Sequence, residues 1–147
     1  MTLDFTIGAL ANPRQEYFLN DQPRPAQSDN WTMRAIDANF EFRIEGICVL
    51  QEEYWSVGEL AMQLTAWLRA GLPSSFHYDC LDAEETDLFT FERHGQDFLF
   101  YSEWQETPGK QVVSQHALAQ FIAQFAATVQ ERIQLDLGLN ARHYLGN

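Results

Sequence analysis

Apolar and polar residues alternate in several short stretches of this 147-residue chain, which is the spacing of strands with one buried face. The first such stretch covers residues 2–8. Residues 31–37 and 40–50 alternate in the same way, and we expect them to form a hairpin. The alternation changes phase at Gly46, so a bulge is expected at that glycine.

Two other stretches have the 3.6-residue periodicity of helices that bury one side. The first follows Ser56, which has the spacing of a capping box with Glu59, and it stops at a glycine and a proline. We therefore expect a helix over residues 57–70. The second helix is expected to begin after a capping serine and to cover most of residues 114–138.

Three further strands are expected at residues 75–79, 88–93 and 98–103, with a tight turn at 94–97 between the last two. Residues 112–113 are expected to add a short edge strand. The expected order of elements is thus strands, helix, strands, helix. This order predicts an α+β fold with a largely antiparallel sheet of about five to six strands and two helices packed on one face.

Length and composition predict a single domain over residues 1–147, because 46% hydrophobic residues supply one core of ordinary size. Three prolines make residues 11–30 a surface loop, and residues 139–147 form a C-terminal tail. The two cysteines are expected to be buried, reduced thiols. Neither a signal sequence nor a run of about 20 apolar residues is present, which predicts a cytoplasmic protein without a membrane partner.

Charge adds a functional expectation, because the net charge of −12 comes entirely from the middle of the chain. Residues 37–106 hold 15 acids and three arginines, whereas the acids and bases of the two flanking segments cancel. A concentrated negative potential repels nucleic acid and attracts basic partners. We therefore expect a binding protein that presents these carboxylates together, and no binding of nucleic acid.

Two acidic groups are the candidate contact surface. The stretch 79–87 holds five carboxylates without a base, and its spacing does not fit a calcium-binding loop. The stretch 103–106 surrounds a tryptophan with carboxylates, which suits a cationic side chain. A merely solvated acidic loop is the alternative. The predicted partner-binding residues are Asp79, Asp82, Glu84, Glu85, Asp87, Glu103, Trp104 and Glu106.

Two alternative functions stay open. His77 and Asp79 would share one face of a strand, so they could serve a small enzyme or a ligand pocket, although a structural histidine has the same pattern. The uncovered sheet face could instead form a homodimer in an adaptor protein. The motifs of zinc proteases, P-loop proteins and serine hydrolases are missing from the sequence. We therefore predict no catalytic residue, metal or cofactor.

Several short motifs, mostly at expected core positions, resemble small uncharacterised bacterial domains. They lie at residues 59–61 (Glu-Leu-Ala), 67–68 (Trp-Leu), 76–78 (Phe-His-Tyr), 89–91 (Phe-Thr-Phe) and 101–104 (Tyr-Ser-Glu-Trp). Some of those domains are similar to immunity proteins of polymorphic and contact-dependent toxin systems. The resemblance implies a protein that binds a cognate toxin, such as a basic nuclease, and covers its active cleft.

Overall fold

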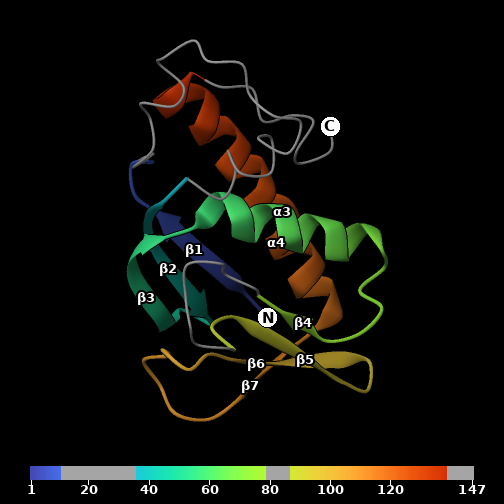
Figure 1. Cartoon of the computed structure of the whole chain (residues 1–147). Helices are drawn as coiled ribbons and strands as arrows, with labels where there is room; N and C mark the ends of the chain where they lie inside the picture. Colours follow the sequence, from blue (N-terminus) through green and yellow to red (C-terminus); the bar gives the residue numbers. More distant parts are fainter. Residues whose placement is uncertain (11–35, 79–86, 139–147) are drawn as a thin grey trace.

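The computed structural model describes residues 1–10, 36–78 and 87–138 (Figure 1). The expected loop at 11–30 and the expected tail at 139–147 lie outside these residues. In chain order, the elements of the described part are β1 (Leu3–Ile7), β2 (Ala38–Ile44), β3 (Ile47–Trp55), α3 (Val57–Arg69), β4 (Phe76–His77), β5 (Thr90–His94), β6 (Asp97–Tyr101), β7 (Gln111–Val113), α4 (Gln115–Arg132) and the π helix η1 (Ile133–Leu137).

The strands form two antiparallel sheets, with the orders β1-β2-β3 and β4-β5-β6-β7. The α+β class and the antiparallel pairing are confirmed, but the expected single sheet of five to six strands is wrong. The free edge of β3 meets the irregular segment after β6, whose Glu106 N–H donates to the Val49 carbonyl over 2.8 Å. Because no strand continues the ladder at this edge, the sheet ends there.

The expected strand at 31–37 lies mostly outside the described residues, but the expectation of one strand over 40–50 is wrong. The observed hairpin joins β2 to β3 through Glu45 and Gly46, whose φ angles of 52° and 76° are both positive, as a type I′ turn requires. Gly46 is therefore a turn residue. The bulges lie within β3, where the register against β2 shifts twice. One shift lets Val49 and Leu50 both be buried. The change of phase at Gly46 comes from the turn itself, which places Ile47 opposite Ile44.

Phe42 of β2 lies at the centre of one aromatic core that joins both sheets and both helices. Its ring centroid is 4.9 Å from that of Phe100 on β6 and 4.9 Å from that of Phe121 on α4. Trp67 of α3 stacks on Phe91 of β5 at 6.1 Å. The two helices cross and contact each other (Figure 1). Both lie on the inner side of the sheets, where Phe121 of α4 meets β2 and Trp67 of α3 meets β5.

The two helix starts differ from each other. Ser114 caps α4 as predicted, since its Oγ accepts the Ala117 N–H at 3.2 Å. The bounds predicted for α3 are confirmed to within one residue, but its capping box is wrong. Glu59 is only 1% exposed and accepts a hydrogen bond from the Tyr78 hydroxyl at 2.9 Å. Because the first turn of α3 is buried on the core, its glutamate points inward and does not reach back to the cap.

The end of β1 is tied to the end of α4 by Asp136. Its Oδ2 accepts the Leu10 N–H at 3.0 Å and lies 3.0 Å from Nη2 of Arg132, which also donates to the Gly8 carbonyl. The Leu10 hydrogen bond and the Arg132 guanidinium lower the pKa of the Asp136 carboxyl below its ordinary value.

Asp136→Ala is therefore expected to lower the free energy of unfolding by about 1 kcal/mol at pH 7, through the lost hydrogen bonds. A lowered carboxyl pKa stabilises the fold above the ordinary value of 3.8, and this contribution disappears as the pH falls through the folded pKa. Urea unfolding at several pH values measures the difference. Glu131→Ala, which removes an exposed acid near the end of α4, is the control. A loss that does not depend on pH would contradict the assignment.

Candidate partner-binding surface

The segment between β6 and β7 is an irregular loop held by its own hydrogen bonds. Ser102 Oγ accepts the Trp104 N–H at 3.1 Å, and the Ser102 N–H donates to Gln105 Oε1 at 2.8 Å. The Gln105 side-chain amide donates in turn to the carbonyls of Thr107 and Gly109. These bonds satisfy backbone groups that no strand partner satisfies, so the loop holds Trp104 in one place.

Trp104 packs against buried aromatic side chains and is partly exposed to solvent. Its ring meets Trp55 edge to face at 6.1 Å and is 37% exposed, whereas Trp55 is only 4% exposed. Trp55 packs in turn on Phe40 and Tyr78. A rigidly supported, half-exposed tryptophan is the kind of side chain that anchors a protein interface.

Carboxylates from two parts of the chain lie around this tryptophan. The backbone bond from Glu106 to β3 brings Glu106 close to Glu52. Burial, followed by the charges of Glu106 and Glu53, raises the pKa of the Glu52 carboxyl above its ordinary value. The Glu103 N–H donates to the Asp87 carbonyl at 3.0 Å, which places the Asp87 backbone beside the loop.

We call this region the Trp104 surface and define it by seven residues that share the β3 edge and the neighbouring loop: Glu52, Glu53, Tyr54, Asp87, Glu103, Trp104 and Glu106. Tyr54 is 76% exposed. Within residues 1–10, 36–78 and 87–138, no ion pair engages Glu52, Glu53, Glu103 or Glu106. The surface therefore combines exposed aromatic rings with uncompensated negative charge.

Comparison with protein families matches residues 16–135 to DUF7878, described as a domain of unknown function. The chain belongs to the DUF7878 family. The DUF7878 match contains the whole Trp104 surface and leaves β1 outside. Comparison with the curated proteins and with the solved structures finds no match. The DUF7878 match shows no link to immunity proteins or toxins, so that resemblance stays a prediction.

Of the eight residues predicted to contact a partner, four lie on the Trp104 surface: Asp87, Glu103, Trp104 and Glu106. The other four, Asp79, Asp82, Glu84 and Glu85, lie outside the described residues. Glu52, Glu53 and Tyr54 were missed by sequence reasoning. The signal that could have found them is the run of polar residues at 51–53, which breaks the alternation of a strand.

The expectation that the carboxylates of the middle segment lie together is only partly correct. Glu41 pairs with Arg43 at 2.9 Å, and Glu92 pairs with Lys110 at 3.1 Å. Glu59 is buried, as described above. The reason is that successive strands carry these acids to different edges and faces of the two sheets. Of the acids in the described part of the chain, those at the β3 edge, in the loop beside it and at Asp87 gather around Trp104.

His77 pairs with Asp87, whose Oδ1 lies 3.2 Å from its Nδ1, and the two side chains are 56% and 38% exposed. The proposed pairing of His77 with Asp79 stays a prediction, since Asp79 is outside the described residues.

Among the described residues, no three His, Cys, Asp or Glu side chains are placed to hold a metal ion. No helix in this part of the chain has the length and apolar character that crossing a membrane requires.

Glu52→Gln is expected to stabilise the protein at pH 7 by a few tenths to about 1 kcal/mol, because solvent screens part of the repulsion that it removes. An acid with a raised folded pKa costs stability as the pH rises from its ordinary value, here 4.5, through the folded pKa, and the cost stays constant above. The gain should therefore be absent near pH 3. Thermal unfolding measures it, with Glu131→Gln as the control. A melting temperature that falls at pH 7 would contradict the assignment.

Proposed function

We propose that this protein is an acidic binding protein whose Trp104 surface takes a basic protein partner. The observation that carries the proposal is the half-exposed Trp104, held on Trp55 beside glutamates that no ion pair engages in the described part of the chain: Glu52, Glu53, Glu103 and Glu106. An exposed indole ring attracts a guanidinium or ammonium group, and nearby carboxylates strengthen that attraction. Such a surface also speeds the encounter with a positively charged protein.

The partner in this proposal is a cognate bacterial toxin, and the protein covers the active site of that toxin as immunity proteins do. Steric occlusion needs only an interface of about 800 Å² on each partner and requires no turnover, metal or cofactor. A nuclease toxin fits this chemistry, because its cleft must hold phosphates with basic side chains. The negative surface would then occupy the place of the nucleic acid. The sequence resemblance to immunity proteins supports this narrower form of the proposal.

Co-expression tests the toxin form directly. The reading frame beside this gene is expressed in a laboratory bacterial host, with the protein or without it. We expect growth to stop with the toxin alone and to recover when the protein is present. Trp104→Ala should fail to restore growth at equal expression, whereas Leu135→Ala, which alters an exposed side chain on η1, should restore it. A neighbouring product that is harmless, or rescue that does not depend on Trp104, would contradict the proposal.

The dimerising adaptor is distinguished by the mass of the protein in solution. Sedimentation equilibrium is expected to give the 17.0 kDa mass of one chain. A stable dimer at micromolar concentration would favour the adaptor instead.

A further inference from the structure

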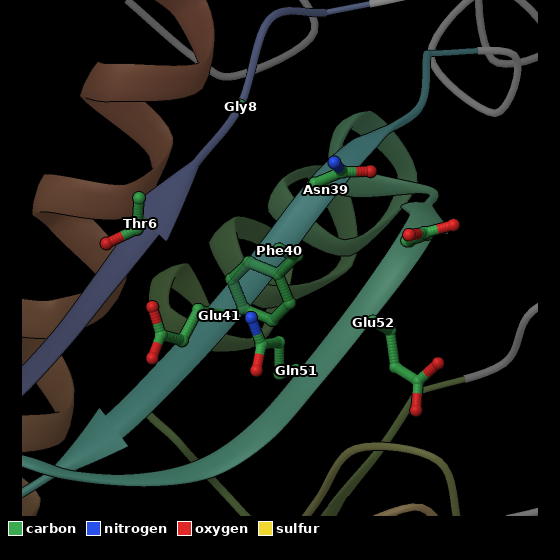
Figure 2. A pocket seen from close by; sticks show the side chains of 8 residues that line it. Thr6, Gly8, Asn39, Phe40, Glu41, Gln51 and Glu52 are labelled. Carbon is green, nitrogen blue, oxygen red and sulfur yellow. The ribbon is translucent and has the colours of Figure 1, made fainter.

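The outer face of the three-stranded sheet carries a hollow of about 570 Å³ (Figure 2). Helix α4 packs on the other side of this sheet, where the core phenylalanines of β1 and β2 contact its Phe121. The residues that border the hollow come from all three strands. Apart from Gly8 and Phe40 they are polar: Thr6, Asn39, Glu41, Gln51, Glu52 and Glu53.

The register of the strands explains the shape of the hollow. Thr6 lies opposite Glu41, and Glu41 lies opposite Gln51, so these three side chains form one row across the sheet. In the next row Gly8 donates its N–H to the Asn39 carbonyl at 2.9 Å. A Cβ atom at Gly8 would lie 3.4 Å from the Asn39 Cβ, and a larger side chain would fill the space above it. The glycine therefore keeps this end of the hollow open.

A bulge in β3 forms the opposite wall. The register passes from Ala38 opposite Trp55 to Phe40 opposite Glu52, so two residues of β3, Glu53 and Tyr54, face one residue of β2. The φ angle of Tyr54 is 55° at this point. The bulge thus brings Glu53 to the hollow and leaves the tyrosine exposed beside it.

The residues that border the hollow supply hydrogen-bond acceptors and no positive charge. The nearby Arg43 already binds Asp4 and Glu41, each at 2.9 Å, and Thr6 Oγ1 at 2.8 Å. Glu52 lies opposite the buried Phe40, so its side chain leaves the β3 edge on the face of Phe40, near Glu106. Figure 2 shows the Glu52 carboxylate turned away from Thr6 and Glu41. The hollow and the Trp104 surface therefore lie on the two sides of the β3 edge and meet at Glu52 and Glu53. Since Arg43 compensates Glu41, the carboxylates that make the hollow complementary to the same basic partner are Glu53 and, at its edge, Glu52.

We propose that this hollow receives an arginine side chain of the basic partner, which then lies across β3 and contacts the Trp104 surface at the same time. The inference rests on the proposed function. Three neighbouring strands span only about 10 Å, which suits one extended side chain better than a helix. Arginine fits better than lysine, because its planar group offers five N–H donors to carboxylates and amide oxygens placed side by side.

Two short peptides, acetyl-(Thr-Arg)₄-amide and acetyl-(Thr-Lys)₄-amide, serve as probes in NMR titrations of the full ¹⁵N-labelled chain. We expect the arginine peptide to shift the amide signals of Thr6, Gly8, Asn39 and Gln51 and to bind more tightly than the lysine peptide. Glu53→Gln should weaken its binding about tenfold, the loss expected for one charge-assisted hydrogen bond. Gly8→Val should also weaken it, and Glu131→Gln should leave it unchanged.

Other outcomes separate the hollow from the proposed function. Shifts confined to residues 103–106 would overturn the hollow as the arginine site while supporting the Trp104 surface. Equal affinity for the two peptides, or no effect of Glu53→Gln, would overturn the preference for arginine. An absence of binding at millimolar peptide would overturn this inference, whereas co-expression tests the proposed function independently. The ¹⁵N spectrum of each variant shows whether it is folded, and Glu53→Gln alters an exposed side chain if Gly8→Val fails to fold.

Discussion

Replacing Phe42 with alanine is expected to lower the free energy of unfolding by about 3–5 kcal/mol, the usual cost of removing a fully buried phenylalanine. The Phe42 side chain is 0% exposed. Its ring contacts Phe89, just before β5, Phe100 of β6 and Phe121 of α4. These partners belong to separate elements that are themselves packed, so they cannot all move inward to fill the space. The cavity term therefore adds to the lost burial.

Urea denaturation at constant pH measures this loss. Phe5→Ala is the matched control, because Phe5 also contacts Phe121 but is only partly buried, at the edge strand β1. We expect its cost to be clearly smaller. If Phe42→Ala cost no more than Phe5→Ala, the two sheets would not share the core described above.

Trp104→Ala is expected to weaken binding of the basic partner by about 30-fold or more, which corresponds to the 2 kcal/mol or more typical of a tryptophan at the centre of an interface. The stability of the free protein should change far less, since more than a third of the ring is already exposed. The loss should appear mainly as faster dissociation, because close contacts determine how long a complex lasts.

Substituting the acids gives a different kinetic signature. Glu103→Gln combined with Glu106→Gln should slow association and reduce its dependence on salt, because charge steers the encounter. Leu135→Ala, far along the chain on η1, should change neither rate. Surface plasmon resonance at several salt concentrations measures both effects with the toxin identified by co-expression. Unchanged dissociation of Trp104→Ala would remove Trp104 from the interface.

Local patterns predicted most elements, because caps, turns and periodicity depend on neighbouring residues. The helix expected at 57–70 is observed at Val57–Arg69, and the turn expected at 94–97 joins β5 to β6. The division into two sheets could not be predicted in this way. It depends on which distant segments pair, and at the β3 edge the segment that contacts β3 is the loop at Glu106.

In the candidate site, too, local patterns were predictable and long-range contacts were not. Trp104 and its neighbouring acids were recognised from local composition alone. Glu52 and Glu53 were not, because their proximity to Glu106 arises from the same long-range contact. The capping box failed for a related reason, since only the packing of α3 shows that Glu59 faces the core.

Site-specific photo-crosslinking in the native host tests the central claim most directly. A photoreactive amino acid replaces either Tyr54, on the Trp104 surface, or Leu135, on η1, and both positions are exposed. The account predicts that position 54 captures one protein of net positive charge and that position 135 does not capture it. Capture of that protein equally from both positions, capture of an acidic protein, or no crosslink from position 54 would contradict the account.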